Sequence, residues 1–413
     1  MGDPSSRFIA AQSKKSSLPS HESTQHAAKD QGLRTSNPSK WYFATGYLLI
    51  AVFCYWGMWI KPAQYGLFKH LDTVLTTGEF PYDSAGGVPL KRNYIGVKAV
   101  DDIFVFLSAV YTSALVKDWE PSLRFMLLYF LGILIQPFAV WMVEGFRRSN
   151  RRTLLSFVTV WFGALQFIGT GIIIPLYYVA YCFVSDRKNY WVPLHREVPV
   201  KYSDTLIWAV TVGYTVPTMV LFMDHPDPFT LQNIESFWQI SPCLVPPLCS
   251  LLASFHGFIK PTTAEDSKQE QKQKSPKPSQ NMNSLKHLYL VTGVMGVLFH
   301  WYCITKVVFD PELTLSSVFW PDFTTQDKTL GEGVKFMLLI DVWTFEVATY
   351  IWSCQAVWEL KRIGHTDADA TRAAALIALA TVVVGPGATL CAVWSWREEK
   401  LATTKSAAAH REL

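Results

Sequence analysis

The sequence lacks the residue patterns that mark common metal and disulfide sites. Its seven cysteines lie in or beside apolar segments and form no CxxC pair, which argues against a zinc site and a disulfide framework. Its ten histidines are scattered, without the HxxxH-type boxes that di-iron membrane oxygenases and desaturases need. We therefore predict that the chain holds no metal.

Motifs for several reaction classes are missing as well. Asp101 and Asp102 are followed by apolar residues, so the chain has no DDxxD motif, and it has no NDxxDxxxD run. Such motifs hold the Mg²⁺ that ionises prenyl diphosphates. A GxSxG elbow, a Walker loop and a GxGxxG fingerprint are also absent. The sequence thus gives no support for diphosphate ionisation, covalent hydrolysis or nucleotide chemistry, and we expect no cofactor.

Charge is scarce and is not arranged to bind nucleic acid. Only 17% of the 413 residues are charged, whereas 50% are hydrophobic and 14% aromatic, which is too apolar for an ordinary soluble enzyme. The net charge is +4, and the basic residues lie in short connections. We predict an integral membrane protein with no nucleic-acid partner.

Long apolar runs predict an all-α fold, a polytopic transmembrane helix bundle. The run at 41–60 is long enough to cross a bilayer and lies too far along the chain for a signal peptide, so we expect a signal anchor. Further runs lie near 96–116, 123–146, 153–183, 204–223, 235–259, 286–309, 334–360 and 372–396. We predict about nine spanning helices, within a range of seven to nine.

Polar segments divide the chain. Residues 1–40, rich in Ser, Lys, His and Gln, predict a disordered cytosolic tail, and 397–413 predict a second disordered tail. Helices 1 to 6 then fall in 41–260, and helices 7 to 9 of the same bundle in 286–396. The Lys/Gln/Ser/Pro-rich stretch 261–285 predicts a flexible linker between them.

The charges of the loops predict the orientation of the bundle, with one conflict. With nine uninterrupted spans, the loops on the side of the N-terminal tail hold most of the Lys and Arg, which places that side in the cytosol. The hinge RRSNRR at 147–152 would lie on the opposite side. Either the helix count is wrong near 153–183, where Pro175 interrupts a long run, or the four arginines serve a purpose other than topology.

Few ionisable side chains lie within the apolar runs, and each marks a candidate site because it is costly in lipid. They are Asp101 and Asp102 at the start of the second run, Glu144 at the end of the third, His300 in the seventh, and Asp341, Glu346 and the terminal Glu359 in the eighth. From the helical rise, Asp101, Glu144 and Asp341 would all lie toward the side of the arginine hinge. We predict a polar pocket that opens on that side.

Simpler explanations of these carboxyls stay open. Asp101 suits a helix N-terminus, and Glu144 is spaced for an intrahelical ion pair with Arg147. Glu359, beside basic residues, suits a solvated helix end. Asp341 and Glu346 are harder to explain in this way, because bulky apolar residues surround them.

Aromatic residues are abundant, with 16 Trp, 17 Tyr and 26 Phe. Most are explained as core or lipid-facing residues, and interfacial belts account for others. Together they suit a cavity for an isoprenoid chain or a carbocation, because aromatic faces attract positive charge.

The hinge and the run after it resemble a known family. The matching residues are Glu144, Arg147 and Asn150 in EGFRRSN, followed by Gln166, Gly169, Gly171, Pro175 and Tyr177. This pattern resembles the integral-membrane terpene cyclases of fungal meroterpenoid gene clusters, those of ascochlorin-, ascofuranone- or drimane-type products. The resemblance implies cofactor-free cyclisation of a farnesyl chain on a polar, usually aromatic head, started by protonation of a terminal epoxide or alkene.

The resemblance also predicts a site, although the family's paired acids have no clear counterpart here. The candidate catalytic carboxyls are Asp341, Glu144 and Asp101. The predicted substrate-binding residues are Arg147, Asn150, Gln166, Glu346, Tyr177 and His300. Arg147 would position Glu144 or the head group, and a Glu144 paired in this way would be a poor proton donor, which leaves Asp341 as the better acid.

The expected partners are a lipophilic prenylated aromatic substrate and membrane lipid, with a pathway epoxidase supplying the substrate and the endoplasmic reticulum as the membrane. Two other functions stay open. A transporter or lipid- or sterol-binding protein would show inverted repeats or paired broken helices, of which we see only the GPG at 385–387. A sterol-type double-bond isomerase would use the same carboxyls in a shorter bundle.

Overall fold

A computed structural model describes residues 37–81, 87–117, 119–187, 190–191, 196–256 and 278–409. Within these ranges the chain is helical, apart from an isolated bridge between Glu79 and Pro89, so the predicted all-α class is confirmed. The predicted N-terminal tail up to residue 36, and the predicted linker up to residue 277, lie outside the described residues.

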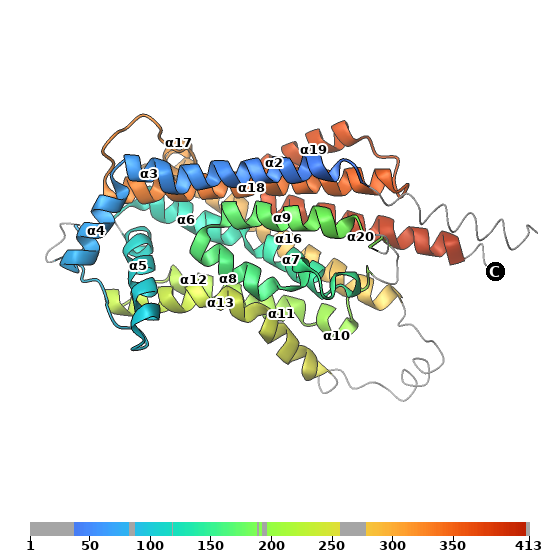
Figure 1. Cartoon of the computed structure of the whole chain (residues 1–413), viewed down its shortest axis with the longest axis horizontal. Helices are drawn as coiled ribbons and strands as arrows, with labels where there is room; N and C mark the ends of the chain where they lie inside the picture. The colour runs from blue at the N-terminus through green and yellow to red at the C-terminus, as the bar shows by residue number, and fades with distance from the viewer. Residues whose placement is uncertain are drawn as a thin grey trace, which may run out of the picture.

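Long helices lie side by side along the main axis of the molecule (Figure 1). They are α2 (Lys40–Tyr55), which continues through η1 (Trp56–Ile60) into α3 (Lys61–Gln64), α6 (Pro121–Ile133) with α7 (Ile135–Phe146), α8 (Val158–Ile168), α9 (Thr170–Ser185), α11 (Leu206–Val210) with η5 (Thr211–Thr215) and α12 (Val216–Leu221), α13 (Pro228–Ser254), α16 (Pro278–Phe309), α18 (Leu330–Arg362), α19 (Ala370–Val383) and α20 (Pro386–Ala409). Further elements connect them: α4 (Leu67–Thr77), α5 (Lys98–Leu115), η2 (Arg148–Asn150), η3 (Leu154–Ser156), α10 (Val200–Ser203) and α17 (Leu315–Phe319).

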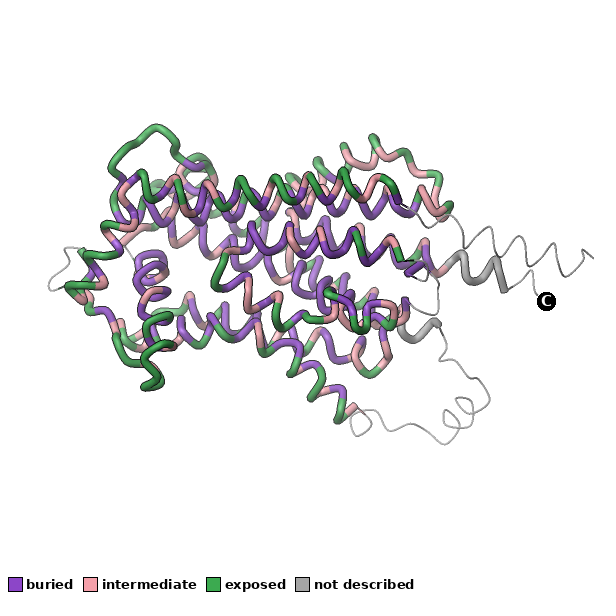
Figure 2. Tube along the Cα trace, in the orientation of Figure 1, coloured by how far each residue is buried: buried purple, intermediate pink, exposed green. Residues whose placement is uncertain are grey.

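Helix α18 is the centre of the bundle, because it packs against α2, α9, α19 and α20 as well as α5 and α6. Figure 2 shows that the interior helices are buried over most of their length, whereas α2 has an exposed outer face. That outer face carries large apolar side chains such as Leu49 and Val52, which suits contact with lipid.

Within the described ranges, four helical segments are long and apolar enough to cross a membrane: Lys40–Gln64, Pro121–Phe146, Pro228–Ser254 and Met282–Phe309. The predicted count of about nine spans is not confirmed. Two predicted spans are each divided into two helices, 153–183 at Gly169 and 372–396 at Gly385. Both glycines have positive φ, +120° and +93°, which side chains disfavour, whereas Pro175 lies inside α9 without ending it.

The predicted second span, 96–116, forms α5, which lies across one end of the bundle (Figure 1). The helices on either side of it meet at that same end. The carbonyl of Tyr65, after α3, accepts the backbone N–H of Lys328, and Lys335 in the first turns of α18 donates to Ser122 at the start of α6, at 3.0 Å. The chain therefore does not cross the bundle between α3 and α6.

The arginine hinge lies at the opposite end, where the described chain begins. Lys40 at the start of α2 pairs with Asp186 after α9, and Tyr190 from the same connection donates to Glu144 beside the hinge, at 3.4 Å. Helices α8 and α9 thus form a hairpin that leaves this end and returns to it. The conflict with the positive-inside rule came from a wrong helix count, both at 96–116 and at 153–183.

The predicted tail at 397–413 is wrong over its first part. Helix α20 continues to Ala409, and Arg397 is fully buried because carboxylates inside the bundle compensate its charge. The end of the predicted linker is also helical, because α16 begins at Pro278 and Leu285 is buried.

Candidate active site

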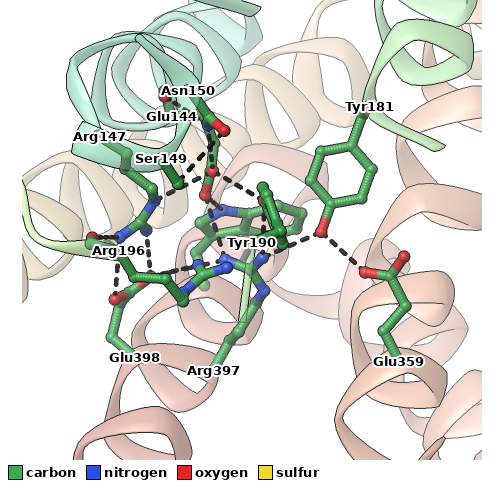
Figure 3. A network of polar contacts seen from close by, with 11 residues as sticks. Glu144, Arg147, Ser149, Asn150, Tyr181, Tyr190, Arg196, Glu359, Arg397 and Glu398 are labelled. Atoms are coloured by element: carbon green, nitrogen blue, oxygen red, sulfur yellow. Dashed lines mark hydrogen bonds and ion pairs between the residues drawn. The ribbon is translucent and has the colours of Figure 1, made fainter. Parts of the chain in front are cut away.

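The hinge end of the bundle contains a buried network of charged residues, drawn in Figure 3. Glu144, in the last turn of α7, has no exposed side-chain surface. One carboxyl oxygen pairs with Arg147 Nε at 3.0 Å, and the other pairs with Arg397 NH1 at 3.1 Å and accepts Trp394 Nε1 at 3.2 Å. The predicted ion pair between Glu144 and Arg147 is confirmed, although Arg397 of α20 makes it an interhelical triad.

Neutral donors complete the shell of Glu144. Asn150 Nδ2 donates to the backbone carbonyl of Glu144 at 2.8 Å and to its carboxyl at 3.4 Å, so Asn150 ties the hinge back onto the end of α7. A carboxylate is tenable in this position because two guanidinium groups and several hydrogen-bond donors replace its hydration. Glu144 is therefore an anion and is poorly suited to donate a proton.

A second carboxylate, Glu398, shares the same arginines. It pairs with Arg147 NH2, with Arg397 NH1 at 3.6 Å and with Arg196 NH2 at 3.9 Å. Arg147 NH1 also donates to the backbone carbonyl of Arg196 at 2.8 Å. The guanidinium of Arg147 thus bridges two carboxylates and fixes the connection that follows α9.

The network extends to α18 through a tyrosine. Arg397 NH2 donates to the Tyr181 hydroxyl at 2.9 Å, and that hydroxyl donates to Glu359 at 2.8 Å. Ser185 and Gln355 donate to the other oxygen of Glu359, each at 3.1 Å. The prediction that Glu359 is a solvated helix end is wrong, because the last turns of α18 are buried against α9.

Only one of the four hinge arginines joins this network. Arg147 is 1% exposed, whereas Arg148, Arg151 and Arg152 lie on the surface. The hinge therefore combines a surface basic cluster, as expected on the positive side of a membrane protein, with one structural arginine.

A cluster of buried aromatic residues lies next to the network, consisting of Trp141, Tyr177, Tyr178, Trp352 and Trp394. Trp141 stacks on Tyr177 with ring centroids 3.8 Å apart, and Trp352 lies 4.3 Å from Tyr178 and 3.9 Å from Trp394. Trp394 joins the cluster to Glu144. In the described part of the chain, the Trp352 indole nitrogen and the Tyr177 hydroxyl are buried without a hydrogen-bond partner. Each such group costs about 1–3 kcal/mol, so this cluster is a natural place for the polar atoms of a ligand.

Glu346 lies on α18 at the other side of this aromatic cluster. Its Oε1 is buried without a hydrogen-bond partner, and its charge would act on the hydroxyls of Tyr129 and Tyr178. Tyr129 is in turn hydrogen-bonded to His300 Nδ1 at 3.0 Å, and His300 Nε2 lies 3.1 Å from the carbonyl of Val382. Glu346 and His300, both predicted for the substrate site, thus lie near Tyr129, whereas Tyr177, also predicted, stacks on Trp141 in the aromatic cluster.

Asp341 has a different environment. Its two oxygens accept the backbone N–H groups of Gly171 at 2.5 Å and Thr170 at 3.2 Å, which begin α9 after the break at Gly169. A carboxylate at a helix N-terminus is stabilised by the helix dipole. Gln166, on α8, makes none of the hydrogen bonds of the charged network in the described part of the chain.

Asp101 lies far from both regions, at the α5 end. Its carboxyl accepts the N–H groups of Ile95 at 2.8 Å, Tyr94 at 3.2 Å and Gly96 at 3.0 Å, and these bonds lower its pKa. The prediction that Asp101, Glu144 and Asp341 share one face is therefore wrong. Asp101 lies at the α5 end, Glu144 at the hinge end and Asp341 between the two ends, because α5 does not cross the bundle.

Several charged and tyrosine members of the network were not identified from the sequence pattern, namely Tyr181, Tyr190, Arg196, Arg397 and Glu398. One signal could have indicated two of them. Trp394, Arg397 and Glu398 are spaced at three and four positions, as on one face of a helix that continues beyond the last apolar run. Tyr190 and Arg196 lie in a connection without regular periodicity and had no such signal.

Comparisons with known proteins identify the family of this chain. The CtvD domain model matches residues 44–402, and the chain belongs to the CtvD domain family. It is 25% identical over 346 residues to terpene cyclase resF of Aspergillus sclerotiorum, which covers 83% of this chain and 90% of the relative. It is 24% identical over 285 residues to terpene cyclase DEP1 of Fusarium langsethiae, which covers 67% and 72%. The predicted resemblance to fungal terpene cyclases is confirmed.

A further relative is larger. The FAD-dependent monooxygenase verC1 of Penicillium polonicum is 24% identical over 318 residues, 77% of this chain, and the chain spans only 38% of that protein's length. No solved structure matches the chain.

Proposed function

We propose that the protein is a membrane-bound terpene cyclase that acts on a farnesyl chain carried by a phenol or quinone. A carboxyl group would protonate a terminal epoxide or alkene of this chain and start a cationic cyclisation, with no diphosphate to ionise. The relatives named terpene cyclase support the reaction class, and the apolar helices support the membrane. The observation that carries the mechanism is the buried aromatic cluster with unpaired polar groups beside Glu346.

Glu346 is the proposed proton donor, in preference to Asp341. Glu346 is half-buried, and its Oε1 is buried without a hydrogen-bond partner in the described part of the chain, so a proton on this oxygen avoids the cost of an unpartnered charge and is available for transfer. Asp341 accepts two N–H groups, which favour the carboxylate. We assign Asp341 the role of positioning the start of α9 against α18.

The proposed steps balance without a further reactant. Glu346 gives its proton to the epoxide oxygen, the bond from that oxygen to the more substituted carbon breaks, and the neighbouring alkene attacks this carbon to form a ring bond. The positive charge moves along the chain as further bonds form. A proton then leaves the substrate and returns to the Glu346 carboxylate, so the product is an isomer of the substrate.

The aromatic cluster would stabilise the cationic intermediates. A cation over an aromatic face gains about 0.5–2 kcal/mol per ring, more where water is excluded. The Tyr178 hydroxyl is hydrogen-bonded to Thr349, three residues from Glu346, and the Tyr178 ring stacks on Trp352. Both rings are fully buried, which also protects a carbocation from capture by water. Glu144 and Arg147 would anchor the head of the substrate rather than take part in proton transfer.

An epoxide fits better than an alkene as the group that is protonated. Several relatives are named FAD-dependent monooxygenases, among them verC1, and flavin monooxygenation is a chemistry that makes epoxides from alkenes. We propose that a flavin-dependent epoxidase supplies the substrate and that the membrane is the endoplasmic reticulum.

Microsomes from a host that expresses the full chain test the proposal. They would be supplied with a farnesylated phenol that bears a terminal epoxide, and in parallel with the unoxidised chain, in D₂O. We expect a cyclic isomer from the epoxide, without carbon-bound deuterium, because the added deuteron lies on an exchangeable hydroxyl. Alkene protonation would instead leave one deuterium on carbon. Unchanged substrate with every head group tried would rule out the cyclase function and favour a binding or transport role.

A further inference from the structure

Among the residues that the structure describes, one guanidinium of the charged network has no hydrogen-bond partner. Arg196 is 5% exposed, and its Nε, NH1 and NH2 atoms are all buried without an acceptor. Its guanidinium carbon lies 5.0 Å from the Tyr190 ring and 5.1 Å from the Trp191 ring, so aromatic side chains hold it in place. Buried arginine side chains in proteins are normally paired, and an unpaired one leaves five N–H donors available.

The charge balance around Arg196 is positive. Its nearest carboxylate in the described part of the chain is Glu398, at 3.9 Å, which is outside hydrogen-bond distance. Glu398 is already paired with Arg147 and lies 3.6 Å from Arg397, while Glu144 is occupied by the same two arginines. Three arginines thus share two carboxylates, and Arg196 is the one left without a close pair.

The position of Arg196 also suits a long substrate whose far end reaches Glu346. The network contacts α18 at Glu359, which is 13 positions from Glu346, or about 20 Å along the helix. An extended farnesyl chain with an aromatic head has a comparable length. The aromatic cluster of Trp141, Tyr177, Tyr178, Trp352 and Trp394 lies between the two ends.

We propose that Arg196 binds a carboxylate on the aromatic head group of the substrate. This inference rests on the proposed cyclase function and names the substrate class: prenylated hydroxybenzoates rather than neutral prenylated quinones. The planar guanidinium offers two parallel N–H donors to a carboxylate, and Tyr190 and Trp191 flank the guanidinium with aromatic rings. Glu346 then meets the terminal epoxide of the same molecule.

Binding of two matched probes to the purified full chain in nanodiscs tests this site. The probes are a tritiated farnesylated hydroxybenzoate and its methyl ester, in phosphatidylcholine nanodiscs. We expect the wild type to prefer the acid by about 10- to 100-fold, the range of a charge-assisted hydrogen bond. Arg196→Gln removes the preference, Arg196→Lys keeps part of it, and Arg148→Gln, a surface arginine of the same hinge, leaves it unchanged.

Each outcome has a distinct meaning. Equal affinity of the wild type for acid and ester, or an undiminished preference in a folded Arg196→Gln protein, overturns the head-group site. Displacement of the acid by phosphatidic acid, but only when Arg196 is present, would assign the site to a lipid phosphate instead. A preference that depends on Arg196 in a protein that cyclises no substrate would leave this site standing and overturn the cyclase function. Cyclisation by a protein whose binding is independent of Arg196 would overturn the head-group site and leave the cyclase function standing.

Discussion

Removal of the Arg397 side chain tests the buried network most severely. Arg397→Met takes away the partner that Glu144 Oε1 has at 3.1 Å and the donor that Tyr181 has at 2.9 Å. Glu144 would lose one of its two ionic partners and would depend on Arg147 alone, which it shares with Glu398. Breaking a buried ion pair by removing one partner typically costs 3–5 kcal/mol, because the remaining charge is left uncompensated. We expect Arg397→Met to lower the free energy of unfolding by about 3 kcal/mol or more.

The double variant Glu144→Gln, Arg397→Met isolates the interaction itself. If the two charges interact directly, the double variant loses less stability than the sum of the single variants, by about 1–3 kcal/mol. The measurement is reversible unfolding of the purified protein in mixed detergent micelles by titration with a denaturing detergent, followed by tryptophan fluorescence. Arg148→Met, which changes an exposed arginine of the hinge, is the matched control and should change stability by less than about 0.5 kcal/mol. A loss of stability below about 1 kcal/mol for Arg397→Met would show that Arg397 does not hold the network together. Additive effects of the two single changes would show that Glu144 and Arg397 do not interact.

Three further predictions follow from other parts of the bundle. Gly171→Ala should lower the free energy of unfolding by about 1–3 kcal/mol, because a Cβ would lie 2.7 Å from the Asp341 carbonyl oxygen. In the same unfolding assay, the control Gly46→Ala in α2, with open space around it, should be neutral or stabilising. Backbone N–H donors lower the pKa of Asp101 below its ordinary value of 3.8. The ionised side chain therefore contributes fully to folding stability above pH 3.8, and this stability is lost as the pH falls through the pKa of the folded state. Asp101→Asn should therefore flatten the acid side of the stability profile, and an unchanged profile would contradict this. In sealed vesicles, a cysteine introduced at exposed Arg151 should react with a membrane-impermeant thiol reagent from the same side as one at Lys361, and a cysteine at exposed Glu312 from the other side. Labelling is measured above that of the native cysteines. Labelling of positions 151 and 312 from one side would contradict the helix hairpin of α8 and α9.

The helical class and the hinge contacts could be predicted from the sequence, because both depend on local patterns. Apolar runs of about 20 residues predict helices in lipid. The spacing of Glu144, Arg147 and Asn150 is short enough for their contacts to follow from the turn that joins them.

The path of the chain through the bundle could not be predicted in the same way. The break at Gly169 and the crosswise placement of α5 depend on tertiary packing, and the hydropathy of 96–116 is that of a spanning helix. A single missed reversal changes the side of every later loop. For this reason the shared face predicted for Asp101, Glu144 and Asp341 was wrong, although each residue was rightly identified as buried.

Arg397 shows a second limit. An arginine that follows the last apolar run has the sequence pattern of a solvated helix end, and only the presence of Glu144 and Glu398 beside it makes burial affordable. Glu144 is 253 residues away from Arg397 along the chain, so local composition gives no sign of this partner.

Conversion of an epoxide by Glu346 variants tests directly whether Glu346 is the proton donor of a cyclase. Wild-type protein, Glu346→Gln, Glu346→Asp and Asp341→Asn would be reconstituted in vesicles, confirmed as folded by their unfolding transitions, and supplied with a farnesylated hydroxybenzoate that bears a terminal epoxide. We expect a cyclic isomer from the wild type. The rate for Glu346→Gln should be lower by at least about 10²-fold, as for loss of a general acid, whereas Glu346→Asp and Asp341→Asn should keep partial activity. Full activity of Glu346→Gln would contradict this role of Glu346.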